Sequence, residues 1–304
     1  MQAIEISNVT KAFGQLIAVN NLSLSVPQGS IYGFIGPNGS GKTTTIRMIM
    51  NILYADSGSI KIMDQVNSGS RLEGVGYLPE ERGLYKKMKV NELLQFHGQL
   101  KNGHNINREI TYWLDTFELT AWTNKKVETL SKGMSQKIQF IATIIDRPKI
   151  IILDEPFSGL DPINAEVIKA AILELQSQGS TIIFSTHDMH MAQRMCDYIF
   201  MIYKGEKVLD GTLKSIQDKY GTDTIHLQTE TGVKALEGIE GIEKINDYGQ
   251  MQEIRIKQDT DSQQILSSLL KKTRITKFEI TQPSLHDIFI RIARPETKEE
   301  PQHA

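Results

Sequence analysis

Residues 31–49 read IYGFIGPNGSGKTTTIRMI, and this stretch decides the fold. Its first five residues form a continuous apolar run, which is typical of a buried strand. Gly36-x-x-x-x-Gly41-Lys42-Thr43 follows directly, and apolar residues then recur at helical spacing as far as Leu53. A strand, a glycine-rich loop and a helix in this order form the arrangement that a phosphate-binding loop requires.

The loop matches the Walker A pattern in full. Glycines let backbone N–H groups converge on phosphate oxygens, and the following helix points its positive dipole end at the same anions. Lys42 is expected to bind the β- and γ-phosphates of ATP, and the Thr43 hydroxyl to ligate Mg²⁺. The predicted nucleotide-binding residues of the loop are Gly36, Pro37, Asn38, Gly39, Ser40, Gly41, Lys42, Thr43 and Thr44. A chance glycine-rich turn before a lysine is the weaker interpretation, because both flanking elements are present.

Two carboxylates follow a second apolar run. Ile150–Leu153 leads straight into Asp154-Glu155-Pro156, so both acids should lie at the carboxyl edge of the sheet, where open α/β sheets bind phosphate ligands. We predict that Asp154 holds Mg²⁺ through water, and that Glu155 orients the attacking water or accepts its proton. By itself Asp-Glu-Pro could equally begin a turn. The phosphate loop upstream makes the catalytic interpretation the better one.

His187 follows a third apolar run, residues 182–185, and can reach the same edge of the sheet. We predict that it donates a hydrogen bond to a γ-phosphate oxygen. The methionines, second histidine and Cys196 that follow it could also indicate a soft-metal site. Helical spacing of Ala192, Met195 and Ile199 explains the cluster better, as the buried face of a helix.

Length and composition suggest about two domains in an ordinary folded protein, with 304 residues, 39% hydrophobic and 23% charged. The net charge of −2 gives no overall reason to expect nucleic-acid binding. Cys196 is the single cysteine, so no intramolecular disulfide can form. The N-terminus lacks a signal-peptide pattern, and no apolar run approaches the roughly 20 residues that span a bilayer. Any membrane-spanning segments are therefore expected in another chain.

The chain divides into a nucleotide-binding region, residues 1–220, and a smaller region, residues 221–293. Residues from about 89 to 149 are mostly helical in pattern and interrupt the α/β alternation, which indicates an inserted helical subdomain. The smaller region has the order β-α-β-β-α-β, which predicts a ferredoxin-like α+β domain. Ser284-x-x-Asp287 is expected to cap its last helix. The charged, proline-containing tail, 294–304, is predicted to be disordered.

A third motif, Leu130-Ser131-Lys132-Gly133-Met134-Ser135-Gln136, lies between the phosphate loop and the acidic pair. In isolation it is only a serine that caps a helix. In this position it resembles the signature motif of ATP-binding-cassette (ABC) transporter ATPases, and the resemblance covers about Ile4 to Gly211. It implies a P-loop NTPase of the ABC type, with a RecA-like core, an N-terminal antiparallel β subdomain and the inserted helical subdomain.

The resemblance extends to single residues outside the Walker motifs. Phe13 looks like the aromatic residue that stacks on adenine, although it could also be a core residue of an N-terminal hairpin. Residues 158–161 (SGLD), which end at Asp161, resemble the D-loop, and His187 resembles the switch histidine. In the family, two cassettes associate head to tail, so Ser131 and the Gly133 N–H would contact the γ-phosphate of the partner's ATP. One cassette per chain implies a homodimer or a pairing with a related ATPase subunit.

Two motifs depart from the family pattern. Glu80 stands where the Q-loop normally has glutamine; its carboxylate can ligate metal or water, but adds negative charge beside the acidic pair. We hypothesise that Glu80 raises the Mg²⁺ dependence of activity and makes it sensitive to pH. In the signature motif, Lys132 and Met134 replace the more usual glycine and glutamine-type residues. Its serine and second glycine are retained, so closure of the ATP sandwich should survive.

Two further segments, PEERGLY at 79–85 and PSLHDIF at 283–289, resemble ATPase subunits of ABC-2-type exporters. That subgroup includes sodium-efflux systems and carries a small C-terminal domain. The resemblance implies a cytoplasmic ATPase, peripheral on the inner face of the cell membrane through a separate permease, that powers export of ions, drugs or peptides. A groove beside residues 80–85 would receive a cytoplasmic helix of the permease. No nucleic-acid partner is expected.

Two alternatives compete with this interpretation. The first is a soluble ABC ATPase that acts on nucleic acid or the ribosome; such relatives usually carry two cassettes or a long coiled coil, and neither pattern is present. The second is a P-loop kinase or GTPase, which would leave Ser131, Gly133 and His187 without a role. Both are weaker than an ATPase coupled to transport.

Overall fold

The computed structural model describes residues 1–66, 72–81, 83–102, 106–221, 223–257 and 260–293. The chain forms two compact units, Met1–Thr212 and Leu213–Ala304. Within the described ranges, none of the helices has both the length and the apolar character needed to cross a bilayer. The tail for which disorder is predicted lies outside the described residues.

The division between the units differs from the sequence-based boundary at residue 220 by one short helix, α7 (Leu213–Asp218). Its side chains bond within the second unit: Gln217 Nε2 donates to the Pro283 carbonyl at 2.8 Å, and Asp218 accepts from Gln282 Nε2 at 2.8 Å. Ile216 on this helix is fully buried. These contacts, made with residues more than 60 positions away, could not be read from local pattern.

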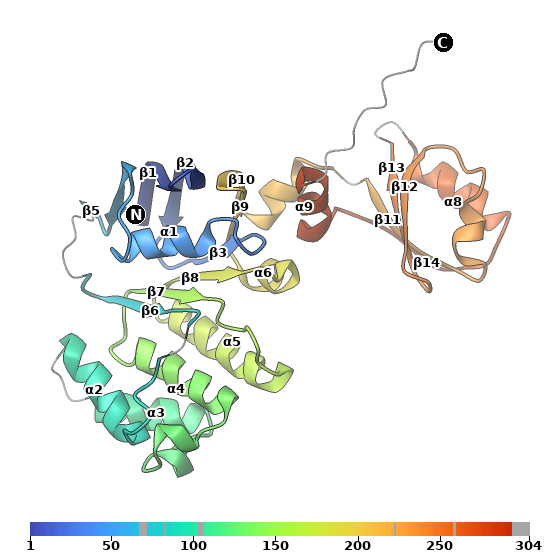
Figure 1. The fold of residues 1–304 in the computed structure, drawn as a ribbon. Helices are drawn as coiled ribbons and strands as arrows, with labels where there is room; N and C mark the ends of the chain where they lie inside the picture. The colour runs from blue at the N-terminus through green and yellow to red at the C-terminus, as the bar shows by residue number, and fades with distance from the viewer. Residues whose placement is uncertain (67–71, 82, 103–105, 222, 258–259, 294–304) are drawn as a thin grey trace. The chain divides into compact units, whose positions relative to one another are not determined.

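The first unit is built on a six-stranded sheet (Figure 1). In spatial order its strands are β10 (Glu206–Gly211), β9 (Tyr198–Tyr203), β3 (Ile31–Ile35), β8 (Thr181–Thr186), β7 (Ile150–Asp154) and β6 (Val75–Leu78). All neighbours are parallel except the β9–β10 hairpin. A separate antiparallel sheet comprises β2 (Leu16–Pro27), β1 (Gln2–Phe13), β4 (Ser57–Ile62) and β5 (Gln65–Val66). The predicted RecA-like core with an N-terminal antiparallel β subdomain is confirmed.

Side chains of the parallel strands are apolar on both faces, because both faces are covered. On β7, Ile151 and Leu153 join one buried cluster, whereas Ile150 and Ile152 join the other. The helix α1 (Lys42–Ile49) covers the second face, and α4 (Lys132–Ile144) and α5 (Pro162–Ser177) cover the first (Figure 1). The short helix α6 (Met189–Met195) follows β8.

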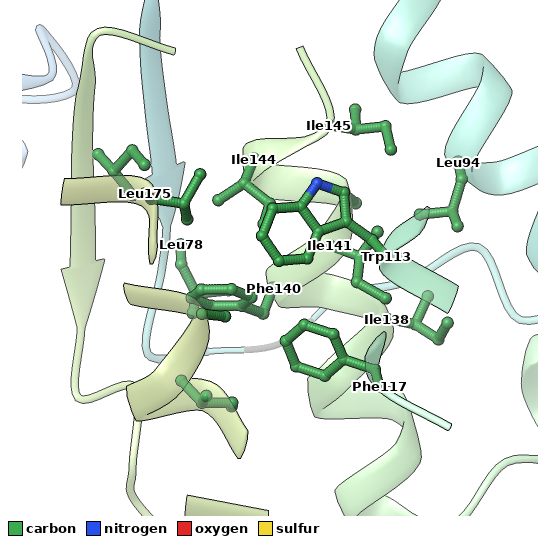
Figure 2. Close-up of a cluster of buried hydrophobic side chains, with 14 of the residues drawn as sticks. Leu78, Leu94, Trp113, Phe117, Ile138, Phe140, Ile141, Ile144, Ile145 and Leu175 are labelled. Atoms are coloured by element: carbon green, nitrogen blue, oxygen red, sulfur yellow. The ribbon is translucent and has the colours of Figure 1, made fainter. Parts of the chain in front are cut away.

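The inserted helical subdomain packs around a group of aromatic side chains (Figure 2). Its elements are α2 (Val90–Asn102), α3 (Asn107–Thr116), the short 3₁₀ helices η1 (Thr120–Trp122) and η2 (Val127–Thr129), and α4. Trp113 packs against Phe117 with ring centroids 6.1 Å apart, and Phe117 against Phe140 of α4 at 5.7 Å. These rings belong to the same buried cluster as Leu153 of the central sheet. The signature-motif helix α4 therefore shares one core with the strand that carries the acidic pair.

The second unit has the predicted ferredoxin-like topology. Its antiparallel sheet has the order β12 (Ile242–Asp247), β13 (Gln252–Ile256), β11 (Thr224–Thr229) and β14 (Ile275–Thr281). The 3₁₀ helix η3 (Gly232–Leu236) and the helix α8 (Ser262–Leu270) bury apolar residues with one face of the sheet, including Ile225, Leu227, Ile254, Ile265 and Leu269. Alternation along each strand leaves polar residues for the opposite face.

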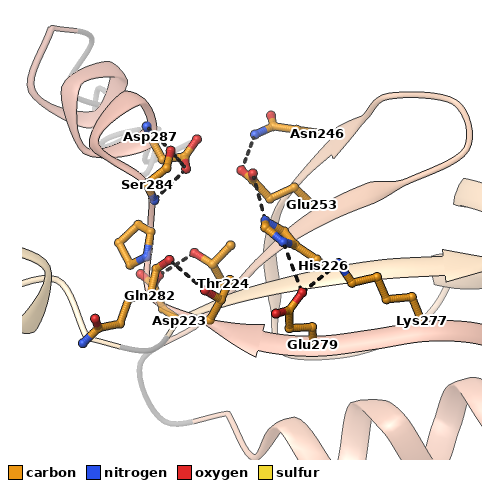
Figure 3. A network of polar contacts seen from close by, with 12 residues as sticks. Asp223, Thr224, His226, Asn246, Glu253, Lys277, Glu279, Gln282, Ser284 and Asp287 are labelled. Carbon is orange, nitrogen blue, oxygen red and sulfur yellow. Dashed lines mark hydrogen bonds and ion pairs between the residues drawn. The ribbon is translucent and has the colours of Figure 1, made fainter. Parts of the chain in front are cut away.

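On that polar face, His226 lies between two carboxylates in one cross-strand row (Figure 3). Its Nε2 is 3.6 Å from Glu253 and its Nδ1 is 3.9 Å from Glu279. The hydrogen bond from Lys277 holds the pKa of Glu279 below its usual range. At the start of α9 (Leu285–Ala293), Ser284 and Asp287 exchange hydrogen bonds, as the capping pattern predicts.

Candidate active site

The phosphate loop connects β3 to α1 and lies at the carboxyl end of the central sheet. Register explains why the other predicted residues reach the same place: Ile35 of β3 pairs with Thr186 of β8, and Ser185 pairs with Asp154 of β7. Three adjacent parallel strands thus end level with one another. The residues that follow them meet at one edge, as expected for a ligand site in an open α/β sheet.

Glycine is required at two positions in the loop. Gly41 has a φ of 113°, and a Cβ there would lie 2.5 Å from the Ala18 carbonyl oxygen. A Cβ at Gly36 would clash with the Ile202 carbonyl oxygen. Lys42 is only 5% exposed, and its Nζ donates to the carbonyls of Gly36 at 2.7 Å and Pro37 at 3.1 Å. The Lys42 side chain therefore lies along the loop, and both are predicted to bind phosphate.

The acidic pair is buried at the end of β7. Asp154 is 1% exposed; its Oδ1 accepts from the Ser185 hydroxyl and lies 3.4 Å from Thr43 Oγ1. Its other oxygen, Oδ2, is buried and has no hydrogen-bond partner among the described residues. Glu155 has a φ of 50°, and its N–H donates to Ser185 Oγ at 3.0 Å. One hydroxyl therefore orients both acids.

Glu155 lies between two predicted site residues. His187 Nδ1 is 3.1 Å from Glu155 Oε1 and 3.2 Å from Oε2, and Lys42 Nζ is 4.0 Å from Oε1. Burial lowers the pKa of Lys42, and the negative charges of Glu155, Asp154 and Glu80 oppose that shift. Lys42 lies 113 positions before Glu155 and 145 before His187, and the level strand ends described above bring these three predicted catalytic residues together.

An open cleft of about 710 Å³ extends from the phosphate loop. Its lining includes the predicted residues Phe13, Asn38, Gly39, Gly41, Lys42, Thr43, Thr44, Glu80 and Glu155. Phe13 is 47% exposed with the Lys11 ammonium 5.5 Å from its ring centre, so it is not a core residue of the hairpin. The apolar end of the cleft at Phe13 and the polar end at the loop match the two ends of a nucleotide.

Eight predicted residues are not part of the cleft lining. Gly36, Pro37, Ser40, Asp154 and His187 belong to the phosphate loop or contact the residues that line it, whereas Ser131, Gly133 and Asp161 lie at the starts of other helices. Ser131 caps α4, accepting from the Met134 N–H at 3.2 Å, and Gly133 lies in the first turn of that helix. Asp161 caps α5, and the hydrogen bond from the Asn164 N–H holds its pKa below the usual range. Within the single chain, Ser131, Gly133 and Asp161 therefore lie at the starts of helices and do not line the chain's own cleft.

The structure also adds residues that the sequence interpretation missed. Leu16 and Ile17, both exposed, line the cleft beside Phe13, and Lys204 lines it from the tip of the β9–β10 hairpin. The hairpin is fixed there because the Gly205 N–H donates to the Ser40 carbonyl at 3.0 Å. Leu16 and Ile17 carried a signal, as apolar residues next to a predicted adenine contact. Lys204 carried none beyond its place in a turn.

Comparison with known proteins is consistent with this geometry. A family model described as ABC transporter matches residues 19–158, and one for the C-terminal domain of DrrA1-3-like ATP-binding proteins matches residues 211–293. The chain is 41% identical to the uncharacterized ABC transporter ATP-binding protein YhaQ of Bacillus subtilis, over 94% of this chain and 97% of the relative.

Other relatives carry more specific names. The linearmycin resistance ATP-binding protein LnrL of Bacillus subtilis is 30% identical over 95% of this chain and 97% of its own. The Nod factor export ATP-binding protein I of a Bradyrhizobium strain is 32% identical, covering 72% of this chain and 73% of its own. A solved ATP-binding subunit of an ABC transporter superposes with a TM-score of 0.68 at 26% identity, covering 72% of this chain and 93% of that one.

Proposed function

This chain belongs to the ATP-binding proteins of ABC transporters, and from that membership we propose how its residues bind and hydrolyse ATP to drive a separate membrane permease. The observation that carries the proposal is the contact of Glu155 with both His187 and Lys42 at the mouth of the phosphate loop. An acid held between two such groups beside a phosphate cradle is suited to promote attack of water on a phosphoryl group.

ATP binds along the cleft, with adenine on Phe13 and the triphosphate on the loop 36–44. Backbone N–H groups of the loop and the start of α1 supply the anion site. Lys42 exchanges its present carbonyl partners for phosphate oxygens. That exchange replaces hydrogen bonds to neutral acceptors by charge-assisted ones, which are roughly twice as strong.

The oxygen atoms near the loop also suit Mg²⁺. Thr43 Oγ1, the unpartnered Oδ2 of buried Asp154, and the Glu80 carboxylate are all hard oxygen donors. Mg²⁺ bound by these residues would neutralise negative charge on the phosphates. A buried carboxylate oxygen without a partner is costly unless something occupies it, which supports the assignment of Asp154.

Hydrolysis then depends on Glu155. Its carboxylate takes up the proton of the attacking water as the oxygen of that water bonds to the γ-phosphorus and the bond to the ADP oxygen breaks. His187 keeps the Glu155 side chain aimed at the cleft and donates to a γ-phosphate oxygen. The Ser185 hydroxyl fixes the backbone of Glu155 by accepting a hydrogen bond from its N–H.

A second subunit completes the site. Ser131 is exposed and does not line its own chain's cleft, and the nearby Gly133 N–H belongs to the first turn of α4. The helix N-terminus they form is an anion site that fits the γ-phosphate bound by a partner, with Asp161 at the same interface. The partner is a second copy of this chain or a related ATPase subunit.

The transport role is export through a permease that holds this chain at the cytoplasmic face of the membrane. Relatives named for linearmycin resistance and for Nod factor export support this direction, and favour transport over a soluble ATPase that acts on nucleic acid or the ribosome. Tyr85 and Phe96 are both exposed and meet edge-on at 5.6 Å, which provides apolar surface for a permease helix. Arg82, within the predicted groove, lies outside the described residues.

The proposal is tested by purifying the chain with the membrane protein that co-purifies with it and measuring ATP hydrolysis. We expect phosphate release that requires Mg²⁺ and rises when the permease is present. Absence of hydrolysis in both the isolated chain and the complex would contradict it.

We predict that Glu80→Gln narrows the difference in ATP affinity with and without Mg²⁺. In the wild type, three carboxylates face the phosphates, so metal-free ATP is repelled more than the magnesium complex. Removal of one charge near the loop should lower the Kd for metal-free ATP by roughly tenfold. The Kd for the magnesium complex of ATP should change less. Fluorescence titration with ATP in EDTA and in Mg²⁺ measures both constants. Glu81→Gln, an exposed neighbour outside the cleft, is the matched control. The hypothesis about Glu80 is wrong if the ratio of the Kd in EDTA to the Kd in Mg²⁺ is the same in Glu80→Gln and wild type and the pH profile of hydrolysis is also unchanged.

We also predict that Lys204→Ala weakens ATP binding by roughly fivefold at low salt, the usual scale of an exposed ion pair. The hairpin touches both Ser40 and the β2 strand, since the Asn20 N–H donates to the Gly205 carbonyl at 2.8 Å. Lys204 therefore lies beside the middle of the cleft, where the ribose and α-phosphate bind. The loss should shrink as salt is raised, because exposed charges are screened. Lys125→Ala, on an exposed lysine outside the cleft, should leave affinity unchanged. A salt-independent loss would show that the lysine acts otherwise than by charge.

A further inference from the structure

Gln136 is a buried polar residue in the signature-motif helix α4. Its side chain is 1% exposed, and its Nε2 donates to the Pro156 carbonyl at 2.8 Å and lies 3.4 Å from the Ser158 carbonyl. Both acceptors belong to the turn that directly follows Glu155. A helix that begins at the signature motif therefore holds the backbone that carries the catalytic carboxylate.

The residue directly before that turn, Glu155, has a strained backbone. Glu155 has a φ of 50°, in the left-handed region that a residue with a side chain rarely adopts. Such a conformation persists only where the surroundings impose it. The Ser185 hydroxyl fixes the amide of Glu155 on one side, and the Ser158 N–H bonds to its carbonyl at 3.1 Å. The Gln136 amide holds the next carbonyls from the side of α4.

Close approach of the two segments extends beyond this one side chain. A Cβ at Gly159 would lie 3.1 Å from Lys132 Nζ, and a Cβ at Gly133 would lie 3.3 Å from Asn164 Nδ2. Asn164 in turn donates from its side chain to Asp161 at 2.5 Å. Together with the Gln136 hydrogen bonds, these close approaches join the start of α4 to the segment that runs from Pro156 to the first turn of α5.

We propose that Gln136 is a positioning residue for Glu155, and that it couples the signature motif of a chain to the catalytic carboxylate of the same chain. The inference rests on the proposed function, in which Ser131 and Gly133 touch the ATP held by the partner. When that contact pulls on the start of α4, the Gln136 amide transmits the movement to the carbonyls of Pro156 and Ser158. Glu155 is then aligned in one site only when the other holds ATP.

The first test is Gln136→Met, a substitution of similar size and shape. The Oε1 atom of Gln136 is buried and has no hydrogen-bond partner among the described residues, so methionine leaves no group stranded on that side. We expect kcat to fall roughly tenfold, the scale of a lost buried hydrogen bond, while the Kd for ATP stays within twofold. Amide hydrogen exchange across residues 155–161 should become faster. Gln139→Met is the control, since Gln139 is also buried on α4 but makes no hydrogen bond to this turn among the described residues; it should retain wild-type kcat and exchange.

The second test is Gln136→Glu, which keeps the shape and makes the donor depend on pH. The ionised carboxylate faces two carbonyl oxygens and cannot donate, whereas the protonated acid restores an O–H donor. Relative to wild type, kcat of this variant should recover as pH falls. A merely structural role predicts a lower melting temperature with no such recovery.

Three results would overturn the inference: wild-type kcat in Gln136→Met, an equal loss in Gln139→Met, or a pH profile of Gln136→Glu parallel to that of wild type. Failure of the proposed function is separate, since it appears as absent hydrolysis in the wild type itself. The exchange measurement reports on the turn even in that case, because it does not depend on turnover.

Discussion

A Glu155→Gln variant is expected to bind ATP at least as tightly as the wild type while its turnover falls by about 10²–10⁴-fold, the range that a general base contributes. The neutral amide preserves the shape of a side chain that is 9% exposed, and it can still contact His187. It cannot take up a proton from water. Removing a negative charge 4.0 Å from Lys42 also leaves that lysine freer to pair with phosphate.

Because hydrolysis reopens the proposed ATP sandwich, the same variant should accumulate as a dimer with ATP. Phosphate release measures the first effect, and light scattering after size-exclusion chromatography measures the second. Glu166→Gln, on an exposed carboxylate of α5 that pairs with Lys169, provides the control, with normal turnover and no trapped dimer. Wild-type turnover in Glu155→Gln would assign the catalytic base elsewhere.

Lys42→Ala should abolish useful ATP binding, with a Kd raised roughly 30- to 150-fold. This corresponds to about 2–3 kcal/mol, the upper part of the range for hydrogen bonds to a charged group. Two features make the effect large. The ammonium is 5% exposed, so water cannot replace it, and it lies among three carboxylates whose charge it offsets.

Isothermal titration with ATP and Mg²⁺ measures this loss, and thermal unfolding without nucleotide checks that the fold is retained. Lys61→Ala, on a lysine of β4 that is 46% exposed and pairs with Glu5 at 3.8 Å, should bind ATP normally. If Lys42→Ala keeps an affinity within threefold of wild type, the loop binds phosphate through its backbone alone.

Much of the fold followed from local pattern. The buried strand Ile31–Ile35, the glycine-rich loop and the helix after it are adjacent in sequence, so their chemistry is legible without any long-range contact. The order of elements likewise predicted the ferredoxin-like unit, because alternation along each strand indicates which face is buried. Its start was misplaced at residue 220, since α7 is held by Pro283 and Gln282, which no local signal announces.

Local sequence pattern predicted only part of the site. Lys42, Asp154, Glu155 and His187 each follow an apolar run, and rules for parallel sheets place such residues at one edge. The separation of Glu155 from His187 and Lys42, however, depends on strand register. Lys204 lies at the site because the β9–β10 hairpin bonds to the phosphate loop, and Ser185 because β8 pairs with β7.

The sequence by itself therefore determined the phosphate loop, the acidic pair and the family, because each is a short motif whose function depends on consecutive residues. The tertiary structure decided which groups touch: Glu155 with His187, Ser185 with both acids, and Gln136 with the turn after Glu155. These contacts join residues 20 to 32 positions apart. They arise from packing α4 and β8 against β7, and such packing is a property of the whole core rather than of any motif.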